Sequence, residues 1–505
     1  MTLAKAHGVV IQGVTGVVVT IEAYLSQGLP GMSIVGLPDT SVGESRDRVR
    51  AAIQNSQLAW PSERRITVGL SPASIHKRGA MLDLGIALAI LTAHQQIPER
   101  HDVVAVGELA LDGSVRPITG VLVAALAART AGKKVILVPL AHVGQAQLIP
   151  GIEVIGVESL ADAVSFLRGE PRVENQPVPI RERTTAEVDL RDVRGQHHAR
   201  MALEIAAAGG HHLAMLGSPG VGKSMLAARL PTLLPALSDE MSIQVTSIHS
   251  IAGTLPAEHG LIRIPPFQAP HHSVTAVALI GGGNSTVKVG LASLAHGGVL
   301  CLDEAAEFNR VVLEALRLPL ETGQVVISRS GFTVTLPARF QLVLAANPCP
   351  CGKFIDSGID CTCPSATRRK YLARLSGPLL DRVDLRVTLT KPTVADFDDS
   401  LPEPETSAVV AKRVANARAR AAKRFASYPW TLNSEVPGAL LRRHFPLQAD
   451  AMHYLRQSIG GLSARGIDRV FRMAWTIADL QERSIPIVED VKLALEFRDG
   501  GGMWQ

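Results

Sequence analysis

The sequence predicts an α/β protein of several domains, and three observations support this fold class. The chain has 505 residues, more than one hydrophobic core normally holds, so about two to four domains are expected. Residues 187–390 repeat helix, apolar strand and glycine loop, the order typical of nucleotide-binding α/β folds. Residues 407–505 follow the apolar periodicity of helices.

The composition is that of an ordinary soluble globular protein, with 46% hydrophobic and 19% charged residues. The formal net charge of +5 permits a nucleic acid partner but does not require one. Five cysteines, an odd and clustered set, exclude a secreted disulfide framework. The apolar residues 1–25 predict two strands rather than a signal peptide, and no apolar run is long enough for a membrane span. We therefore expect a cytoplasmic protein without a membrane partner.

Two breaks in the pattern predict the domain boundaries. Residues 170–186 are rich in proline and charge and lack periodicity, as expected of a linker. Residues 391–406 are acidic and contain three prolines, which favours a surface connection. The predicted division is an N-terminal domain at 1–168, a linker at 169–186, a nucleotide-binding core at 187–391 and a helical lid at 392–505.

The N-terminal domain is predicted to mix strands and helices. Residues 16–25 and 133–139 are short apolar runs typical of strands, and 82–96 has the length and apolar content of a buried helix. Residues 103–118 predict a hairpin whose turn is Asp112-Gly113.

The core contains a phosphate-binding loop. The run Gly217-x-x-x-x-Gly222-Lys223-Ser224 follows the apolar strand 212–216 and opens a helix, the context that makes this motif specific. Backbone N–H groups of the loop and of the helix N-terminus can face an anion. Lys223 is predicted to reach the β- and γ-phosphates of ATP, and Ser224 to coordinate Mg²⁺. The other predicted phosphate contacts are Gly217, Ser218, Pro219, Gly220, Val221 and Gly222.

Two further strands carry polar residues at their ends. Asp303 and Glu304 follow the apolar strand 299–302. Asp303 is predicted to hold Mg²⁺ through water, and Glu304 to polarise the attacking water, which indicates hydrolysis rather than binding alone. Asn347 ends the next such strand, where its side chain can orient the water or contact the γ-phosphate. Cys301, inside the second strand, is interpreted as a small buried hydrophobic residue.

These strands and polar residues resemble the core of the AAA+ ATPases, in which Asn347 would be the first sensor. Arg382, within SGPLLDRVDL, resembles the arginine finger of the magnesium-chelatase and replicative-helicase branch. Such a finger acts on the ATP of a neighbouring subunit and implies a ring. Arg465, in the first turn of a helix capped by Ser463, matches the second sensor of the lid. For both arginines, a surface salt bridge is the alternative.

Two insertions in the core resemble those of the magnesium-chelatase-like AAA+ clade. One contains the pair His271-His272, which we interpret as part of a loop in preference to a metal site, and the other is a hairpin at 325–338. In ring helicases of the clade, such insertions line the pore and touch DNA, so the resemblance implies DNA contacts at Lys288 and Arg329. The alternative, that both are only exposed cations, stays open.

The N-terminal domain resembles the Lon protease domain at residues 71–91 and 104–139. The position of the Lon serine is Met81 here, and the position of the Lon lysine is Leu122. A serine nucleophile needs a hydroxyl group and a neutral base, and neither residue supplies one. The resemblance therefore implies the fold without the protease activity, and we expect the domain to bind DNA or stabilise the ring.

Over nearly its full length the chain resembles the ComM/YifB family. The resemblance implies a hexameric ATPase that drives branch migration of DNA in homologous recombination and natural transformation. Residue types and spacing alone indicate a ring ATPase. The alternatives are a chelatase-type motor that remodels a protein partner, a nucleotide-dependent scaffold, and an ATP-dependent protease, which Met81 and Leu122 disfavour.

Two clusters remain. One is a set of two cysteine pairs, Cys349 with Cys351 and Cys361 with Cys363. The four thiolates can bind Zn²⁺ tetrahedrally, an interpretation that we favour over four free thiols.

The segment 412–424 carries six basic residues and no acid on one predicted helix. Since they spread around the helix, we interpret them as a solvated lid face rather than a grip on phosphates.

Overall fold

The protein is described here by a computed structural model, which covers residues 2–77, 79–171, 188–256, 259–283, 288–329, 332–354, 360–393, 396, 398, 402–458, 460 and 462–500. Its contacts divide the chain into two compact units. The first unit is Met1–Arg183 with Ser242–Ile262, and the second is Thr184–Met241 with Arg263–Gln505. Most of the linker predicted at 169–186 lies outside the described residues.

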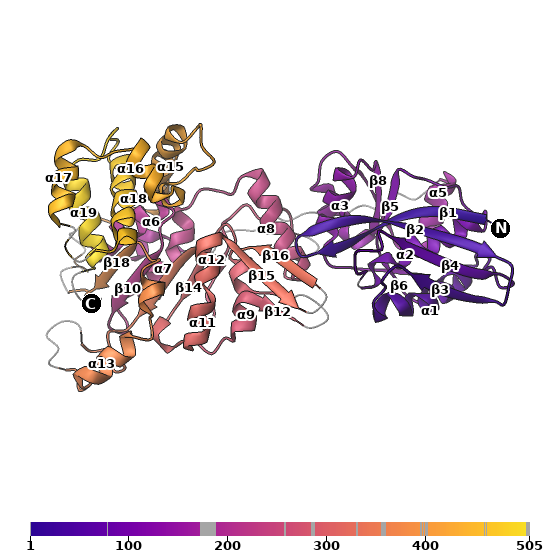
Figure 1. The fold of residues 1–505 in the computed structure, drawn as a ribbon, viewed down its shortest axis with the longest axis horizontal. Coiled ribbons are helices and arrows are strands. Elements are labelled where there is room, and N and C mark those ends of the chain that lie inside the picture. Colours follow the sequence, from indigo (N-terminus) through magenta and orange to yellow (C-terminus); the bar gives the residue numbers. More distant parts are fainter. Residues whose placement is uncertain are drawn as a thin grey trace. The chain divides into compact units, whose positions relative to one another are not determined.

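The first unit contains a four-stranded sheet in the order β1-β2-β4-β3 (Figure 1). Its strands are β1 (Thr2–Gln12), β2 (Thr15–Ser26), β3 (Gly31–Val35) and β4 (Arg65–Ser71). Gln12 pairs with Thr15, which leaves a two-residue turn whose first residue, Gly13, has φ of +61°. Alternate residues of β2, from Val19 to Leu25, are buried, so one face of the sheet covers the core.

A parallel sheet, a small hairpin and several helices complete this unit. The sheet has the order β5-β8-β9, and the hairpin pairs β6 with β7 around the predicted Asp112-Gly113 turn. These strands are β5 (Val103–Ala105), β6 (Glu108–Leu109), β7 (Val115–Arg116), β8 (Val135–Pro139) and β9 (Glu153–Val157). The α-helices are α1 (Thr40–Asn55), α2 (Asp83–Ala93), α3 (Val121–Thr130), α4 (Val143–Gln147), α5 (Leu160–Arg168) and α8 (Asp239–Ile251), which begins just before Ser242. Every residue of α2 except Thr92 is buried, as its apolar sequence predicts.

The two residues at the positions of the Lon serine and lysine lie in an apolar environment in this structure. Met81 lies in the short 3₁₀ helix η1 (Ala80–Leu82), and Leu122 is fully buried in α3. Both pack in one apolar cluster that also contains Val9 and Val104. An apolar cluster stabilises the fold but offers no nucleophile and no base.

The second unit is built on a five-stranded parallel sheet in the order β11-β14-β17-β10-β18. The strands are β10 (Leu213–Gly217), β11 (Phe267–Gln268), β14 (Val299–Leu302), β17 (Gln341–Ala346) and β18 (Leu385–Leu389). All residues of β10, β14 and β17 are buried, as expected of a parallel sheet covered on both faces. The segments predicted as strands at 212–216 and 299–302, and the strand predicted to end at Asn347, thus form the centre of this sheet.

Helices and two hairpins surround this sheet. The hairpins pair β12 (Gly281–Gly282) with β13 (Lys288–Val289), and β15 (Gln324–Arg329) with β16 (Phe332–Pro337). The helices of the nucleotide-binding core are α6 (His197–Gly209), α7 (Lys223–Leu233), α9 (Ala276–Ile280), α10 (Leu291–Leu294), α11 (Arg310–Ala315), α12 (Arg317–Thr322), α13 (Ser365–Leu372) and α14 (Gly377–Leu380). The lid helices are α15 (Ser407–Arg424), α16 (Gly438–His444), α17 (Ala449–Ser458), α18 (Ala464–Leu480) and α19 (Val488–Asp499), which lie together in Figure 1.

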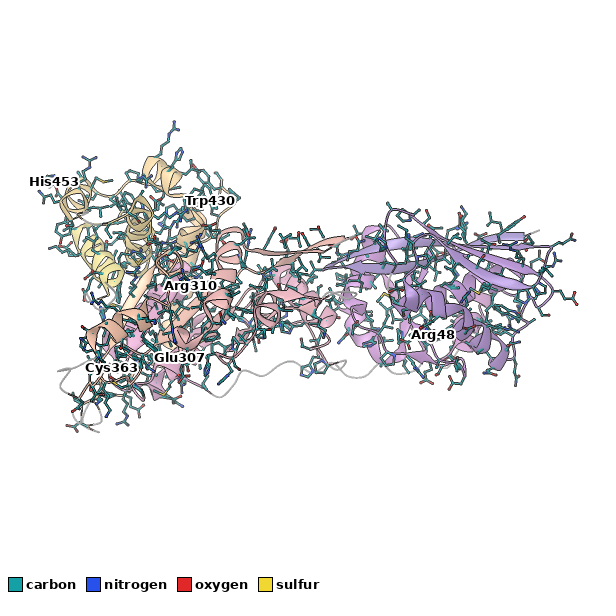
Figure 2. The ribbon with its side chains drawn as sticks, turned by 60° about the horizontal axis from the view of Figure 1, so that its bottom comes forward. Arg48, Glu307, Arg310, Cys363, Trp430 and His453 are labelled. Atoms are coloured by element: carbon teal, nitrogen blue, oxygen red, sulfur yellow. The ribbon has the colours of Figure 1, made fainter. Side chains whose placement is uncertain are left out.

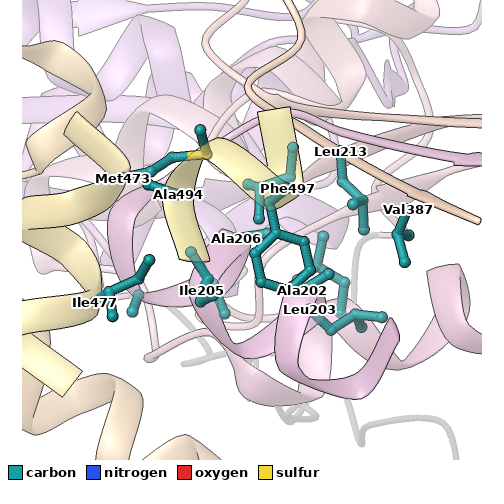
Figure 3. Close-up of a cluster of buried hydrophobic side chains, with 14 of the residues drawn as sticks. Ala202, Leu203, Ile205, Ala206, Leu213, Val387, Met473, Ile477, Ala494 and Phe497 are labelled. Atoms are coloured by element: carbon teal, nitrogen blue, oxygen red, sulfur yellow. The ribbon is translucent and has the colours of Figure 1, made fainter. Parts of the chain in front are cut away.

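One hydrophobic core joins the sheet to the lid. Phe497 of α19 is fully buried against residues of α6, among them Leu203, and against Leu213 and Val387 of the sheet (Figure 3). Met473 and Ile477 of α18 belong to the same cluster. Because the core is continuous, the lid and the sheet form a single compact unit.

Arginines of the lid helix α15 form ion pairs and hydrogen bonds with neighbouring helices. Arg413 pairs with Glu204 at 2.6 Å, and Arg424 pairs with Asp479 of α18 at 2.5 Å. Arg418 donates to the backbone oxygen of Ala207 at 2.6 Å. The predicted solvated face is therefore wrong for these arginines, since other helices supply their partners, although Lys412 and Lys423 of the same helix are exposed.

A buried ion pair connects the sheet edge to the lid. Asp384, the residue before β18, is 2% exposed and accepts from the N–H of His212 at 3.0 Å and from Arg469 of α18 at 2.5 Å. Burial by itself would raise the pKa of this carboxyl, but the charge of Arg469, with His211 and His212, lowers it well below its ordinary value. The carboxylate is thus charged and paired at neutral pH.

Replacing Asp384 by asparagine is expected to lower the free energy of unfolding by about 3–5 kcal/mol, because Arg469 keeps its charge and loses its partner. Guanidinium titration measures this, and an Arg263→Gln variant, which removes an exposed pair with Asp239, should change the free energy by at most about 1 kcal/mol. The Asp384 contribution is present above the unfolded pKa of about 4 and is lost as the pH falls through the lowered folded pKa. Equal losses in both variants would contradict this account.

Within the described part of the chain, no helix is both long enough and apolar enough to cross a membrane.

Candidate active site

Three neighbouring strands deliver the predicted site residues to one edge of the sheet. β14, β17 and β10 are adjacent and parallel, so their carboxyl ends share an edge. The phosphate loop follows β10, Asp303 follows β14, and Asn347 follows β17. Ligands of open α/β sheets bind at this edge, outside the carboxyl ends of the strands.

The phosphate loop has the backbone of an anion-binding turn. β10 ends at Gly217, and α7 begins at Lys223 with Gly222 as its N-cap residue. Gly220 and Gly222 have φ of +80° and +95°, values that a residue with a Cβ rarely adopts. The free N–H groups at the start of α7 therefore face the loop, where a phosphate is favoured by the helix dipole.

Lys223 is held inside this loop. Its side chain is nearly buried, at 7% exposure, and Nζ donates to the backbone oxygens of Gly217 at 2.7 Å and Ser218 at 2.8 Å. A third bond, of 3.0 Å, reaches Oδ1 of Asn347. Burial lowers the pKa of Lys223, while the nearby Asp303 and Glu304 act to raise it. Because its three hydrogen-bond acceptors are neutral oxygens, this ammonium group suits an anionic ligand.

Ser224 and Asp303, the two predicted Mg²⁺ ligands, meet across the site. Oγ of Ser224 donates to Oδ2 of Asp303 at 2.5 Å, and Oδ1 of Asp303 accepts from the N–H of Glu304 at 2.9 Å. Hydroxyl and carboxylate oxygens are the ligands that Mg²⁺ prefers. The donor set beside Lys223 therefore fits a magnesium nucleotide.

Glu304 has an unusual backbone and an unexpected neighbour. Its φ of +51° and ψ of +43° are left-handed, which is uncommon for a residue other than glycine and is often found at functional sites. Its side chain is 55% exposed, and Oε2 lies 3.3 Å from Nδ1 of His272. The rings of His271 and His272 are 4.0 Å apart.

Sequence reasoning assigned His272 only to a loop and missed this contact. The available signal was its position shortly after β11, which is next to β14 in the sheet. A residue that follows β11 reaches the same edge as one that follows β14.

Arg382 and Arg465, the predicted arginine finger and second sensor, converge on one carboxylate in this structure. Nη2 of Arg382 bonds Glu321 of α12, and Nη1 donates to the backbone oxygen of Pro378 at 2.6 Å. Arg465 lies 3.9 Å from the same Oε1 of Glu321. Arg382 is 7% exposed, whereas the Arg465 side chain is 65% exposed. No sequence pattern pointed to Glu321 as their partner.

The four clustered cysteines come together. Their Sγ atoms all lie within 4.8 Å of one another. Sγ of Cys349 is 3.4 Å from that of Cys351, and both are 3.7 Å from that of Cys361. Four sulfurs about 2.3 Å from one tetrahedral Zn²⁺ stand about 3.8 Å apart, so this spacing fits a metal. Cys363 is labelled at the edge of the second unit in Figure 2.

The two predicted DNA contacts lie on the hairpin insertions. Lys288 begins β13 and is exposed. Arg329 ends β15, and its side chain falls outside the described residues, as do the tips 284–287 and 330–331 of both hairpins. DNA contact by these residues stays a prediction.

The chain matches three family models. The model described as "Magnesium chelatase, subunit ChlI" matches residues 189–397. "Subunit ChlI of Mg-chelatase" matches residues 21–142, and "Magnesium chelatase, subunit ChlI C-terminal" matches residues 404–498.

Full-length relatives are found among bacterial proteins. An uncharacterized protein of Mycobacterium tuberculosis is 48% identical over 505 residues, 99% of both chains. The protein YifB of Escherichia coli is 39% identical over 503 residues, 99% of this chain and 97% of its own. The competence protein ComM of Haemophilus influenzae is 40% identical over 492 residues, 95% of this chain and 94% of its own.

The N-terminal part is also similar to Lon proteases. Lon protease of Trichlorobacter lovleyi is 30% identical over 139 residues, which is 26% of this chain and 17% of that protein. This similarity agrees with the Lon-like fold expected for the N-terminal domain.

Proposed function

Because the chain belongs to the ComM/YifB family of magnesium-chelatase-type AAA+ ATPases, we propose that it is a ring motor that moves along DNA and promotes branch migration in homologous recombination. The observation that carries the ATPase part is the meeting of Lys223, Ser224, Asp303 and Asn347 at one edge of the sheet. The DNA part is supported by the 40% identity to a protein named for competence. In a host that takes up DNA, the motor would serve natural transformation.

The roles of the site residues follow from their positions. Lys223 binds the β- and γ-phosphates, and Ser224 and Asp303 hold Mg²⁺, which neutralises the charge that develops during phosphoryl transfer. Glu304 polarises the attacking water, and His272 positions the Glu304 carboxylate. Asn347, bonded to Lys223, orients the water or contacts the γ-phosphate.

The assembly is proposed as a homo-oligomer, with six subunits as the expected number. Arg382 would act on the ATP of the next subunit, and Arg465 would serve as the second sensor of the lid, as the AAA+ resemblance implies. Lys288 and Arg329, on the two hairpins, are the candidate contacts to DNA phosphates. In a ring, the hairpins of all subunits would surround one DNA strand or duplex.

The four cysteines are proposed to bind a structural Zn²⁺. The spacing of their Sγ atoms fits tetrahedral thiolate coordination with no open position. Thiolate ligands need a reducing compartment, so this proposal goes together with a cytoplasmic protein.

A chelatase-type motor that remodels a protein partner is the second candidate. It is favoured by the match of residues 189–397 to the magnesium chelatase model. ATP turnover separates the two candidates, since a DNA motor is stimulated by DNA and a protein remodeller by its client.

Lys223→Ala is expected to lower kcat/KM for ATP by about 10²–10³-fold, since it removes the central cation of the phosphate loop. The variant should also fail to resolve labelled three- and four-stranded DNA junctions, which the wild type resolves when ATP is present. Lys134→Ala, an exposed lysine outside the site, should behave as wild type. Wild-type ATP turnover without DNA stimulation or junction movement would refute the DNA motor and leave the chelatase-type candidate.

A further inference from the structure

The cysteine cluster is attached directly to the residue that contacts Lys223. β17 ends at Ala346, and Asn347, the next residue, accepts from Nζ of Lys223 at 3.0 Å. Cys349 follows two residues later and is fully buried. Any shift of the cluster along this short segment therefore moves Asn347 relative to the phosphate loop.

A second link joins the cluster to the phosphate loop itself. Gly352, next to Cys351, is buried and packs on Pro219 so closely that a Cβ at Gly352 would lie 2.4 Å from Cδ and 2.6 Å from Cγ of that proline. Real Cβ atoms do not approach other atoms so closely. The φ of Gly352 is +76°, and its N–H donates to the oxygen of Cys349 at 2.9 Å, which closes a turn between the first two cysteines. This turn therefore forms one wall of the phosphate loop.

The other two cysteines lie beyond a connecting segment. Cys361 and Cys363 precede α13, and Sγ of Cys361 lies 3.7 Å from the sulfurs of both Cys349 and Cys351. Among the described residues, the Cys349–Gly352 turn has one backbone–backbone hydrogen bond of its own, and the backbone N–H groups of Lys353 and Phe354 also bond the sulfur of Cys349. A metal bound by all four sulfurs would add a covalent-strength anchor to that turn, because structural Zn²⁺ sites contribute directly to local folding.

We propose that the metal bound by the four cysteines sets the affinity of the phosphate loop for ATP, with the Gly352–Pro219 contact as the mechanical link. The metal-bound turn holds Pro219 and Asn347 in the positions that present the loop N–H groups and Lys223 to the phosphates. Loss of the metal frees the turn, and the loop then binds ATP more weakly. The inference rests on the proposed zinc occupancy and on the proposed ATP site.

Two variants distinguish the effect of the bound metal on ATP affinity from the effect of the Gly352–Pro219 contact. Cys361→Ser/Cys363→Ser removes the two ligands that lie outside the Cys349–Gly352 turn. Gly352→Ala keeps all four ligands but introduces the clashing Cβ at a left-handed backbone position. We expect the double serine variant to lose zinc and to bind a fluorescent ATP analogue at least about tenfold more weakly. We expect Gly352→Ala to keep one zinc per chain, measured by elemental analysis, with a similar rise in Kd. Cys301→Ala, which removes the buried cysteine outside the cluster, should keep both zinc and affinity.

A double-mutant cycle tests the link itself. Pro219→Ala removes Cγ and Cδ, the two atoms that the new Cβ would meet. Gly352→Ala should therefore cost less affinity in the Pro219→Ala background than alone, and the cost that remains reflects the left-handed backbone of residue 352. Equal costs in both backgrounds would overturn the proposed contact. Wild-type affinity in the zinc-free serine variant would overturn the coupling, as would unchanged Kd when a zinc-selective chelator strips the wild type and Zn²⁺ is added back.

The same measurements separate this inference from its premises. Wild-type protein that binds the analogue but contains no zinc overturns the metal proposal and the inference, and leaves the ATP site in place. Wild-type protein that contains zinc but binds no analogue overturns the ATP site.

Discussion

Glu304→Gln is expected to slow ATP turnover strongly while ATP still binds. Glu304→Gln keeps the size of the side chain but removes the charge that is proposed to polarise the attacking water, so kcat should fall by about 10²–10⁴-fold. Lys223 and Ser224, the residues proposed to hold the nucleotide, are unchanged, so Kd for ATP should stay near the wild-type value. Steady-state hydrolysis gives kcat, and binding of a fluorescent analogue gives Kd.

A nearby carboxylate provides the matched control for this variant. Glu307 lies three residues later, and its carboxylate pairs with Arg374 at 3.2 Å. Glu307→Gln should therefore keep kcat close to that of the wild type. If Glu304→Gln hydrolyses ATP at the wild-type rate, Glu304 is not the residue that activates water, and its left-handed backbone and its contact with His272 need another explanation.

The central strands and their polar ends could be predicted because the signals are local. The strand 299–302 was expected from four apolar residues, and Asp303 from the carboxylate directly after them. Parallel strands share a carboxyl edge, so residues at three strand ends meet without any knowledge of the loops between them. The hydrogen bonds of Lys223 to Asn347 and of Ser224 to Asp303 agree with this reasoning.

The partners of the arginines could not be predicted, because they depend on packing between distant elements. Glu321 meets Arg382 only after α12 and the turn after α14 have packed together. In the same way, the pattern of α15 shows its arginines on several sides of a helix but does not show that Glu204 and Asp479 face them. A helical pattern identifies which side of a helix is polar. It does not identify the residues of other elements that compensate the charges on that side.

Arg382 is expected to have the largest effect of any single residue on turnover. If it acts on the neighbour's ATP, Arg382→Ala should lower kcat by about 10³–10⁵-fold, because an arginine finger stabilises the charge of the transferred phosphoryl group. In the single chain, its Nη2 bonds Glu321, so formation of the proposed ring would have to redirect this guanidinium toward the neighbouring site. Steady-state hydrolysis at saturating ATP and at a protein concentration that supports assembly measures the loss.

Mixing experiments decide whether Arg382 acts between subunits. Lys223→Ala chains lack a working phosphate loop but keep Arg382, and Arg382→Ala chains have the opposite defect. In mixed rings, some interfaces combine an intact loop of one chain with an intact arginine of the next, so a mixture should hydrolyse ATP faster than either variant alone. If Arg382 acts only within its own chain, every chain of the mixture carries a defect and no activity returns. That result, with a large drop in thermal stability of Arg382→Ala, would make the Glu321 pair a structural salt bridge of the core.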